Sequence, residues 1–152
     1  MKTLILAALL CALLAQTSAE GFNYFDCLDD WDPINFRCFK YVPKAMTWAD
    51  AQKNCRSYKA NLAYVRDAKE NGKIQEMIRQ GKAAWIGSTD AQKEGCWSWV
   101  DGSTFTYANW APGQPDNYQG NENCLQISTE GRWFWNDLDC QTPLPSVCVR
   151  NY

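Results

Sequence analysis

The stretch APGQPDNYQGNENC, residues 111–124, is a polar segment that ends at a cysteine. It carries two carboxylates, two prolines and two glycines, and Tyr118 is its one large apolar side chain before the cysteine. Such a segment adds little to a core. It belongs to a longer stretch, Asp101 to Asn123, without regular pattern, and a loop of that length in a compact domain is usually functional or disordered. The cysteine directly after it favours order, so the segment is the first candidate for a functional site.

Five oxygen-bearing side chains lie in or near this segment: Gln114, Asp116, Glu122, Asn136 and Asp137. A disulfide between Cys124 and Cys140 would hold the segment beside the strand end at 136–137 and make the five converge. Hard oxygen ligands without histidine or cysteine suit Ca²⁺, which takes six to eight oxygens. A cis bond before Pro115 would turn its two flanking side chains toward one point. Spacing alone leaves open the alternative of a polar surface loop that binds nothing.

Residues 1–19 have the pattern of a secretory signal peptide. A basic start is followed by an apolar run, residues 4–15, that is too short to span a bilayer, and by small residues at 17–19. An uncleaved anchor is the alternative, which the early polar end of the run disfavours. No later segment approaches membrane-spanning length. The sequence therefore predicts a secreted, extracellular protein without membrane insertion, whose residues 20–152 form one domain.

Composition argues against several classes of function. Without Lys2, 14 basic residues face 17 acidic ones, and the net charge of −3 is a poor balance for a nucleic-acid binder. The chain has no histidine, so the usual general base of an enzyme is missing. Asp116 and Glu122 could be imagined as a hydrolytic carboxylate pair, but metal ligation explains both with fewer assumptions. We therefore expect a binding protein rather than an enzyme.

Seven cysteines remain after the predicted signal peptide: Cys27, Cys38, Cys55, Cys96, Cys124, Cys140 and Cys148. In an exported chain they indicate a disulfide framework, and their spacing is too wide and irregular for a zinc cluster. Six of them can pair in about fifteen ways, which the sequence alone does not decide. Because seven is odd, one cysteine is spare.

Two capping boxes predict two helices, at 47–50 and at 67–70. The expected apolar face of the first consists of Trp48, Ala51, Cys55 and Tyr58, and that of the second of Ile74, Met77 and Ile78, with Gly81 as the stop. Residues 38–42 alternate like a strand, and short apolar runs follow at 85–86, 97–100, 125–127, 133–135 and 147–149. The pattern predicts an α+β domain with two helices in its first half and a small, mostly antiparallel sheet in its second.

Residues Cys27 to Cys148 resemble a C-type lectin-like domain, most closely the secreted single-domain type found in fish lectins and type II antifreeze proteins. The motifs that carry the resemblance are Trp85-Ile86-Gly87, Glu94-Gly95, Trp97-x-Trp99-x-Asp101-Gly102, Asn109-Trp110, Gln114-Pro115-Asp116, Glu122-x-Cys124 and Trp135-Asn136-Asp137. The resemblance implies two helices, small antiparallel sheets and a long calcium-binding loop. It also implies the disulfides Cys27–Cys38, Cys55–Cys148 and Cys124–Cys140.

The resemblance further implies a Ca²⁺ ion held by Gln114, Asp116, Glu122, Asn136 and Asp137. In such lectins two sugar hydroxyls complete the calcium shell and hydrogen-bond Gln114, Asp116, Glu122 and Asn136. The order Gln-Pro-Asp is that of galactose-type lectins, whereas Glu-Pro-Asn lectins tend to take mannose. An aromatic ring that covers galactose often follows, and here Tyr118, one position later than expected, is the candidate, while Trp110 is expected to be structural.

Two further features of the sequence have alternatives. A second calcium site of some relatives corresponds to Asp90, Glu94, Asn117, Glu122 and Asn123, where two amides replace acids and weaken the attraction for a divalent ion. Loop stabilisation by Asp90 and Glu94 is the other interpretation. Cys96 is the spare cysteine, either a buried free thiol or an interchain disulfide in a homodimer, which would strengthen binding to a glycan-coated surface.

The leading hypothesis is a secreted, calcium-dependent, galactose-type lectin that recognises glycans on microbial or cell surfaces, as in innate immunity. One alternative is an ice-binding protein like the type II antifreeze proteins, although those generally carry more disulfides than seven cysteines permit. Another is a protein-binding module or toxin with this fold, and such proteins have usually lost the calcium ligands.

Overall fold

The computed structural model describes residues 26–78, 82–130 and 134–151. The predicted signal peptide and its cleavage point lie outside these residues. Neither of the two α-helices described, each ten residues long, has the length and apolar character needed to cross a membrane.

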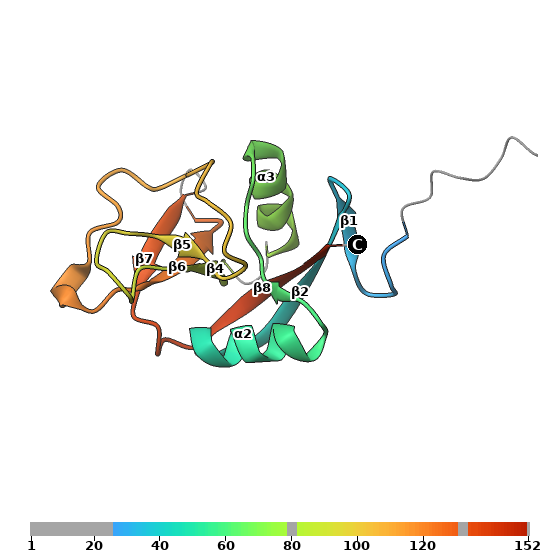
Figure 1. The fold of residues 1–152 in the computed structure, drawn as a ribbon, viewed down its shortest axis with the longest axis horizontal. Helices are drawn as coiled ribbons and strands as arrows, with labels where there is room; N and C mark the ends of the chain where they lie inside the picture. Colours follow the sequence, from blue (N-terminus) through green and yellow to red (C-terminus); the bar gives the residue numbers. More distant parts are fainter. Residues whose placement is uncertain (1–25, 79–81, 131–133, 152) are drawn as a thin grey trace, which may run out of the picture.

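A mixed, eight-stranded sheet forms the centre of the domain (Figure 1). Its strands are β1 (Asp32–Ile34), β2 (Arg37–Met46), β3 (Asn61–Leu62), β4 (Ala83–Thr89), β5 (Ser98–Trp99), β6 (Cys124–Ser128), β7 (Trp135–Leu138) and β8 (Leu144–Asn151). The order is β1-β2-β8-β4-β6-β7, with β3 on β8 and β5 on β4. All pairings are antiparallel except that of β4 with β8, at Trp85 and Ser146.

The expected sheet of the second half is therefore too small. The C-terminal strand β8 pairs with both β2 and β4, and so joins the first half of the chain to the second in one sheet. Local alternation in sequence indicates that a strand exists. The residues of β2 that pair with β8 lie about a hundred residues earlier in the chain, and a local pattern does not reveal such a distant partner.

Both predicted helices are confirmed, together with their N-terminal caps. Helix α2 (Trp48–Ser57) begins after Thr47, whose hydroxyl accepts from the Asp50 amide at 3.2 Å, and α3 (Ala68–Met77) begins after Asp67, whose carboxylate accepts from the Glu70 amide at 2.9 Å. Figure 1 shows the two helices on opposite sides of the sheet. Of the expected face of α2, Tyr58 is wrong, because it follows the last turn and is 40% exposed. The predicted stop at Gly81 lies outside the described residues, and α3 ends at Met77.

The inner face of α3 buries polar groups as well as the expected Ile74 and Ile78. Glu70, Asn71 and Gln75 are at most 4% exposed. Glu70 accepts from Arg37 Nε at 3.2 Å and from the Arg66 amide at 2.8 Å. The apolar stripe of the sequence did not predict these residues.

Disulfides connect the parts of the chain that lie far apart in sequence. The structure contains Cys27–Cys38, which closes the β1–β2 hairpin, Cys55–Cys148, which joins α2 to β8, and Cys124–Cys140, which joins β6 to the turn after β7. This is the pairing that the resemblance implies. Cys96 is free and exposed, so the alternative of a buried thiol is wrong.

Candidate functional site

The long loop between β5 and β6 lies at the end of the molecule opposite the β1–β2 hairpin (Figure 1). Its regular structure is a short 3₁₀ helix, η1 (Tyr118–Gly120). The peptide bond between Gln114 and Pro115 is cis. Asn117 and Gln119 have left-handed backbone angles, φ of 45° and 58°, so the chain turns tightly around η1 and returns toward Cys124.

The first half of this loop is fastened to β7. The Trp135 amide donates to Asn109 O at 2.8 Å, and the Ala111 amide donates to Trp135 O at 2.9 Å. The rings of Trp110 and Trp135 meet edge to face, with centroids 5.9 Å apart. Trp110 is therefore a packing residue, as expected from the sequence.

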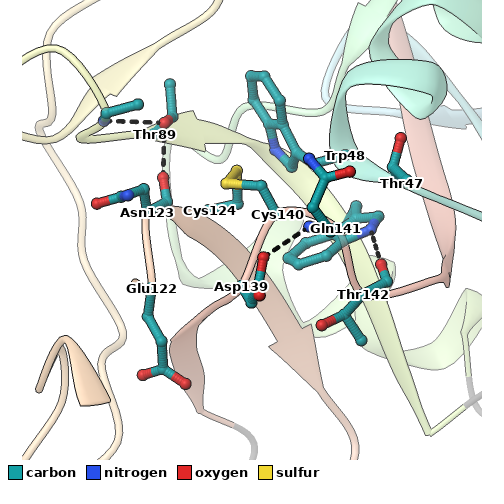
Figure 2. Close-up of a disulfide and its surroundings, with 12 residues drawn as sticks. Thr47, Trp48, Thr89, Glu122, Asn123, Cys124, Asp139, Cys140, Gln141 and Thr142 are labelled. Carbon is teal, nitrogen blue, oxygen red and sulfur yellow. Dashed lines mark hydrogen bonds between the residues drawn. A yellow bond between two sulfur atoms is a disulfide. The ribbon is translucent and has the colours of Figure 1, made fainter. Parts of the chain in front are cut away.

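Two hydrogen bonds and the Cys124–Cys140 disulfide hold the second half of the loop near the candidate ligand Glu122. Thr89 Oγ1 donates to Asn123 O at 2.6 Å, and Figure 2 shows this contact next to the disulfide at Cys124. Asn121 Nδ2 donates to Asp139 Oδ2 at 2.9 Å. In the same view the Glu122 side chain extends away from the disulfide. The sequence did not reveal Thr89, Asn121 or Asp139 as anchors, because nothing in their spacing separates them from other polar loop residues.

Three carboxylates meet between the loop and β7. Asp116, Glu122 and Asp137 each offer an oxygen, and these oxygens all lie within 4.8 Å of one another. Asp116 is exposed, Glu122 is half-buried and Asp137 is fully buried. Asn136 and Asp137 lie inside β7, paired with Gln126 and Leu125, rather than at a strand end as the sequence suggested.

Peptide N–H groups of the loop point at these carboxylates. The two oxygens of Asp137 accept from the amides of Asp116, at 3.1 Å, and Asn117, at 2.8 Å. The Tyr118 amide donates to Asp116 Oδ1 at 3.3 Å and to Glu122 Oε2 at 3.1 Å. Asn117 Oδ1 accepts from the Glu122 amide at 3.1 Å. These contacts give the loop a defined shape around the acidic cluster.

Two residues that neighbour Asp116 and Asp137 in sequence have buried amide oxygens without a hydrogen-bond partner among the described residues, namely Gln114 Oε1 and Asn136 Oδ1. A buried acceptor left without a partner costs about 1–3 kcal/mol. A bound cation would satisfy both. Three carboxylates and two neutral amide oxygens, without nitrogen or sulfur, form the donor set that calcium prefers, so the five residues fit the ion.

The acidic surroundings change the protonation of Glu122. Partial burial raises the pKa of this carboxyl, the neighbouring Asp116 and Asp137 raise it further, and the hydrogen bond from the Tyr118 amide opposes them. The pKa of Glu94 is also raised, by desolvation and by the Asp90 carboxylate. Negative charge at this end of the molecule is therefore in excess, which favours a cation.

The residues of the second candidate calcium site are partly engaged in other contacts. Asp90 is 2% exposed, and its Oδ2 accepts from the Gly95 amide at 2.8 Å, while its Oδ1 has no partner among the described residues. The Asn117 side chain and the Asn123 carbonyl hold the loop in the contacts given above. The Asn117 side chain thus has a structural role in the loop, whereas Asn123 contributes through its backbone carbonyl, and Glu94 lies at an exposed turn.

Tyr118, the candidate sugar-stacking residue, lies in η1 and is 64% exposed. Its backbone amide donates to two candidate calcium ligands, Asp116 and Glu122, so the backbone of Tyr118 lies beside the acidic cluster. An exposed aromatic ring next to polar donors is an arrangement that can cover the apolar face of a ligand.

Comparison with known proteins identifies the fold and the family. The family described as "Lectin C-type domain" matches residues 44–150. Ladderlectin of Oncorhynchus mykiss is 37% identical over 133 residues, 85% of this chain and 69% of that protein. The galactose-specific lectin nattectin of Thalassophryne nattereri is 33% identical over 147 residues, 94% and 92% of the two chains. The solved structure of herring type II antifreeze protein superposes with a TM-score of 0.78 at 35% identity, covering 83% of this chain and 99% of that one. This chain belongs to the C-type lectin domain family.

Proposed function

We propose that this protein is a secreted, calcium-dependent lectin that binds galactose-type glycans on microbial or cell surfaces. The observation that carries the proposal is the convergence of three carboxylate oxygens within 4.8 Å, beside two buried amide oxygens that have no protein partner among the described residues. The relatives include a lectin named for galactose specificity. The Gln-Pro-Asp order at 114–116 supports the same specificity.

In this proposal Gln114, Asp116, Glu122, Asn136 and Asp137 hold the ion. Bound calcium supplies open coordination positions for two neighbouring hydroxyls of a sugar. The carboxylates of Asp116 and Glu122 can only accept hydrogen bonds from those hydroxyls, whereas the amide groups of Gln114 and Asn136 can donate to them.

This arrangement of donors and acceptors gives the site its selectivity. The amide of Gln114 comes before Pro115 and the carboxylate of Asp116 after it. This order is the feature that would favour galactose over mannose. Tyr118 covers the apolar face of the sugar. No covalent bond is made or broken, so the activity is binding rather than catalysis.

Two further parts of the proposal concern the whole protein. Residues 1–19 direct secretion, in keeping with the disulfides. Cys96, being free and exposed, links two copies into a disulfide-bonded homodimer. Paired sites then gain by effective concentration on a glycan-coated surface.

The test is retention of the mature protein on immobilised galactose and on immobilised mannose, with calcium and with chelator. Retention on galactose with release by chelator is the expected result. Retention on mannose alone would refute the specificity, and retention unaffected by chelator would refute the role of calcium.

Ice binding is a second candidate, favoured by the similarity to herring type II antifreeze protein. Thermal hysteresis of the purified protein tests it. A protein that binds calcium, is not retained on either sugar and shows hysteresis would move the function to ice binding.

A further inference from the structure

Three buried side chains connect helix α3 to the sheet beneath the loop. Trp135 Nε1 donates to Asn71 Oδ1 at 2.8 Å, and Asn71 Nδ2 donates to Gln75 Oε1 at 3.1 Å. Gln75 Nε2 in turn donates to Ser128 O of β6, also at 3.1 Å. Trp135 is 0% exposed, Asn71 4% and Gln75 3%. We call Asn71 and Gln75 the amide relay, since each side chain accepts one hydrogen bond and donates the next in the series.

Trp135 is the residue on which the first half of the loop rests. Four aromatic rings pack edge to face against its indole, with centroid distances of 5.7–5.9 Å and interplanar angles of 82–88°. They belong to Trp99, Phe105, Tyr107 and Trp110. The last three belong to the loop. The backbone of Trp135 also exchanges hydrogen bonds with Asn109 and Ala111. The orientation of one indole therefore sets the packing of three loop side chains.

Trp135 is connected to candidate calcium ligands both through β7 and through the loop. Asn136 and Asp137 follow Trp135 directly in β7. Gln114 lies three residues beyond Ala111, whose amide donates to the carbonyl oxygen of Trp135. The Gln114 amide itself donates to Ala111 O at 2.9 Å. A change in the Trp135 ring would reach Gln114 through the loop and Asn136 through the strand.

The bond to Asn71 fixes that ring. A buried indole N–H without an acceptor loses its hydrogen bond to water and gains none in the protein, which costs free energy. Without Asn71 the ring would therefore tilt toward another acceptor. Edge-to-face contacts depend on ring orientation, and all four would change together. Replacing Asn71 would thus disturb the loop although Asn71 lies on α3 and contacts no candidate ligand in any of its hydrogen bonds.

We propose that Asn71 is a positioning residue for the calcium-binding loop, acting through the indole of Trp135. Its effect on calcium affinity rests on the proposed function. Its effect on the loop does not, and can be measured in the metal-free protein.

The first experiment compares Asn71→Leu with Ile78→Val by amide hydrogen exchange in chelator. Ile78 is fully buried at the end of α3 and takes no part in the relay, so it controls for a general loss of stability. We expect exchange at Ala111 and Trp135 to quicken about tenfold in Asn71→Leu, the factor for one buried hydrogen bond. We expect no such local change in the control at a matched loss in Tm. Equal exchange at these two amides in the two variants would overturn the proposal.

A double-mutant cycle shows whether Asn71 acts through Trp135. Trp135→Phe removes the indole N–H, so adding Asn71→Leu should then have little further effect on exchange, whereas additive effects would overturn the proposed route. Should Asn71→Leu not fold, Asn71→Ala removes the same acceptor and takes its place in the cycle.

Calcium binding by the same variants gives the functional readout. We expect a several-fold weaker Kd in Asn71→Leu and an unchanged Kd in Ile78→Val. Calcium affinity could stay unchanged in both Asn71→Leu and Ile78→Val while hydrogen exchange changes only in Asn71→Leu. That result would overturn the positioning role and leave Asn71 and Gln75 with a role in packing alone. If the unaltered protein binds no calcium, the proposed function fails, and the exchange experiment still decides the role of Asn71 in the loop.

Discussion

Two fully buried carboxylates, Glu70 of α3 and Asp137 of β7, lie in different electrostatic surroundings. Glu70 pairs with Arg37, which is 2% exposed, and with Arg66. Asp137 receives two peptide N–H groups and faces two further carboxylates, and no ion pair found among the described residues involves any of the three.

The difference separates a structural charge from one suited to a ligand. A buried charge is costly unless it is paired and hydrogen-bonded. At Glu70 the protein supplies the cation itself, and the guanidinium of Arg37 also lies over the rings of Phe39 and Tyr64, 4.9 and 4.1 Å from their centroids. At Asp137 no described residue forms an ion pair, and in the proposed function a bound Ca²⁺ ion is the pairing cation. The two sites should therefore respond oppositely to mutation.

The largest effect is expected at the structural site. Arg37→Met leaves Glu70 buried beside only the half-exposed Arg66, and should lower the free energy of unfolding by about 3–5 kcal/mol. Urea denaturation of the metal-free protein measures this. Arg66→Met is the matched control and should cost less than about 1 kcal/mol, since its side chain is 48% exposed. Similar losses of unfolding free energy in Arg37→Met and Arg66→Met would contradict the view that Arg37 is the main partner of Glu70.

The proposed calcium site should show the reverse pattern. Glu122→Gln removes a carboxylate whose charge the surroundings disfavour, so the Tm of the metal-free protein should stay the same or rise. Calcium affinity should fall about tenfold or more, because ligand charge tunes affinity. Calorimetric titration and thermal melts in chelator test both. A large drop in Tm without calcium would show that Glu122 serves the fold, as Glu70 does.

The pH dependence follows from the raised pKa of Glu122. Calcium competes with protons for this carboxylate, so affinity should begin to fall, on acidification, above the ordinary glutamate value of 4.5. The metal-free protein should respond in the opposite sense. Its folded state holds the Glu122 proton more tightly than the unfolded state, so this group's contribution to stability is complete below 4.5 and is lost as pH rises through the raised pKa.

Calcium titrations and urea melts from pH 4 to 7 measure the two trends. Glu122→Gln is the control, and its metal-free stability should lack this dependence. A loss of affinity that starts only below 4.5 would contradict the raised pKa.

The smallest expected effect concerns the sugar alone. Tyr118→Ala should weaken galactose binding by about 0.5–1.5 kcal/mol, the range for an aromatic contact, and leave calcium affinity unchanged. Inhibition of binding by free galactose measures it. Tyr58→Ala, which removes another exposed tyrosine ring, far from the loop in sequence, is the control and should have no effect. Equal affinities in both variants would remove Tyr118 from the sugar site.

The sequence predicted the parts of the fold that depend on neighbouring residues. The caps at Thr47 and Asp67 are local, and so are the apolar runs that became strands. The disulfide pairing came from the resemblance, since spacing left it open. The burial of Glu70, Asn71 and Gln75 was not predictable, because polar residues on an amphipathic helix are normally assigned to its exposed face.

The candidate site was predictable as a set of residue types, but not as a geometry. Carboxylates and amides at 114–137 indicate calcium through their chemistry. The contacts that shape the site, from the loop amides to Asp137 and from Thr89 to Asn123, depend on backbone positions that residue type does not reveal. The same holds for the two unpartnered amide oxygens, which became visible only once burial was known.

Calcium binding by the mature, metal-free protein in equilibrium dialysis tests the central claim most directly. We predict one tightly bound ion per chain, absent in Asp137→Asn, and tighter binding when galactose is added but not when mannose is. Failure of the unaltered protein to retain calcium, with or without galactose, would contradict the assignment of Asp116, Glu122 and Asp137 as a site completed by an external cation.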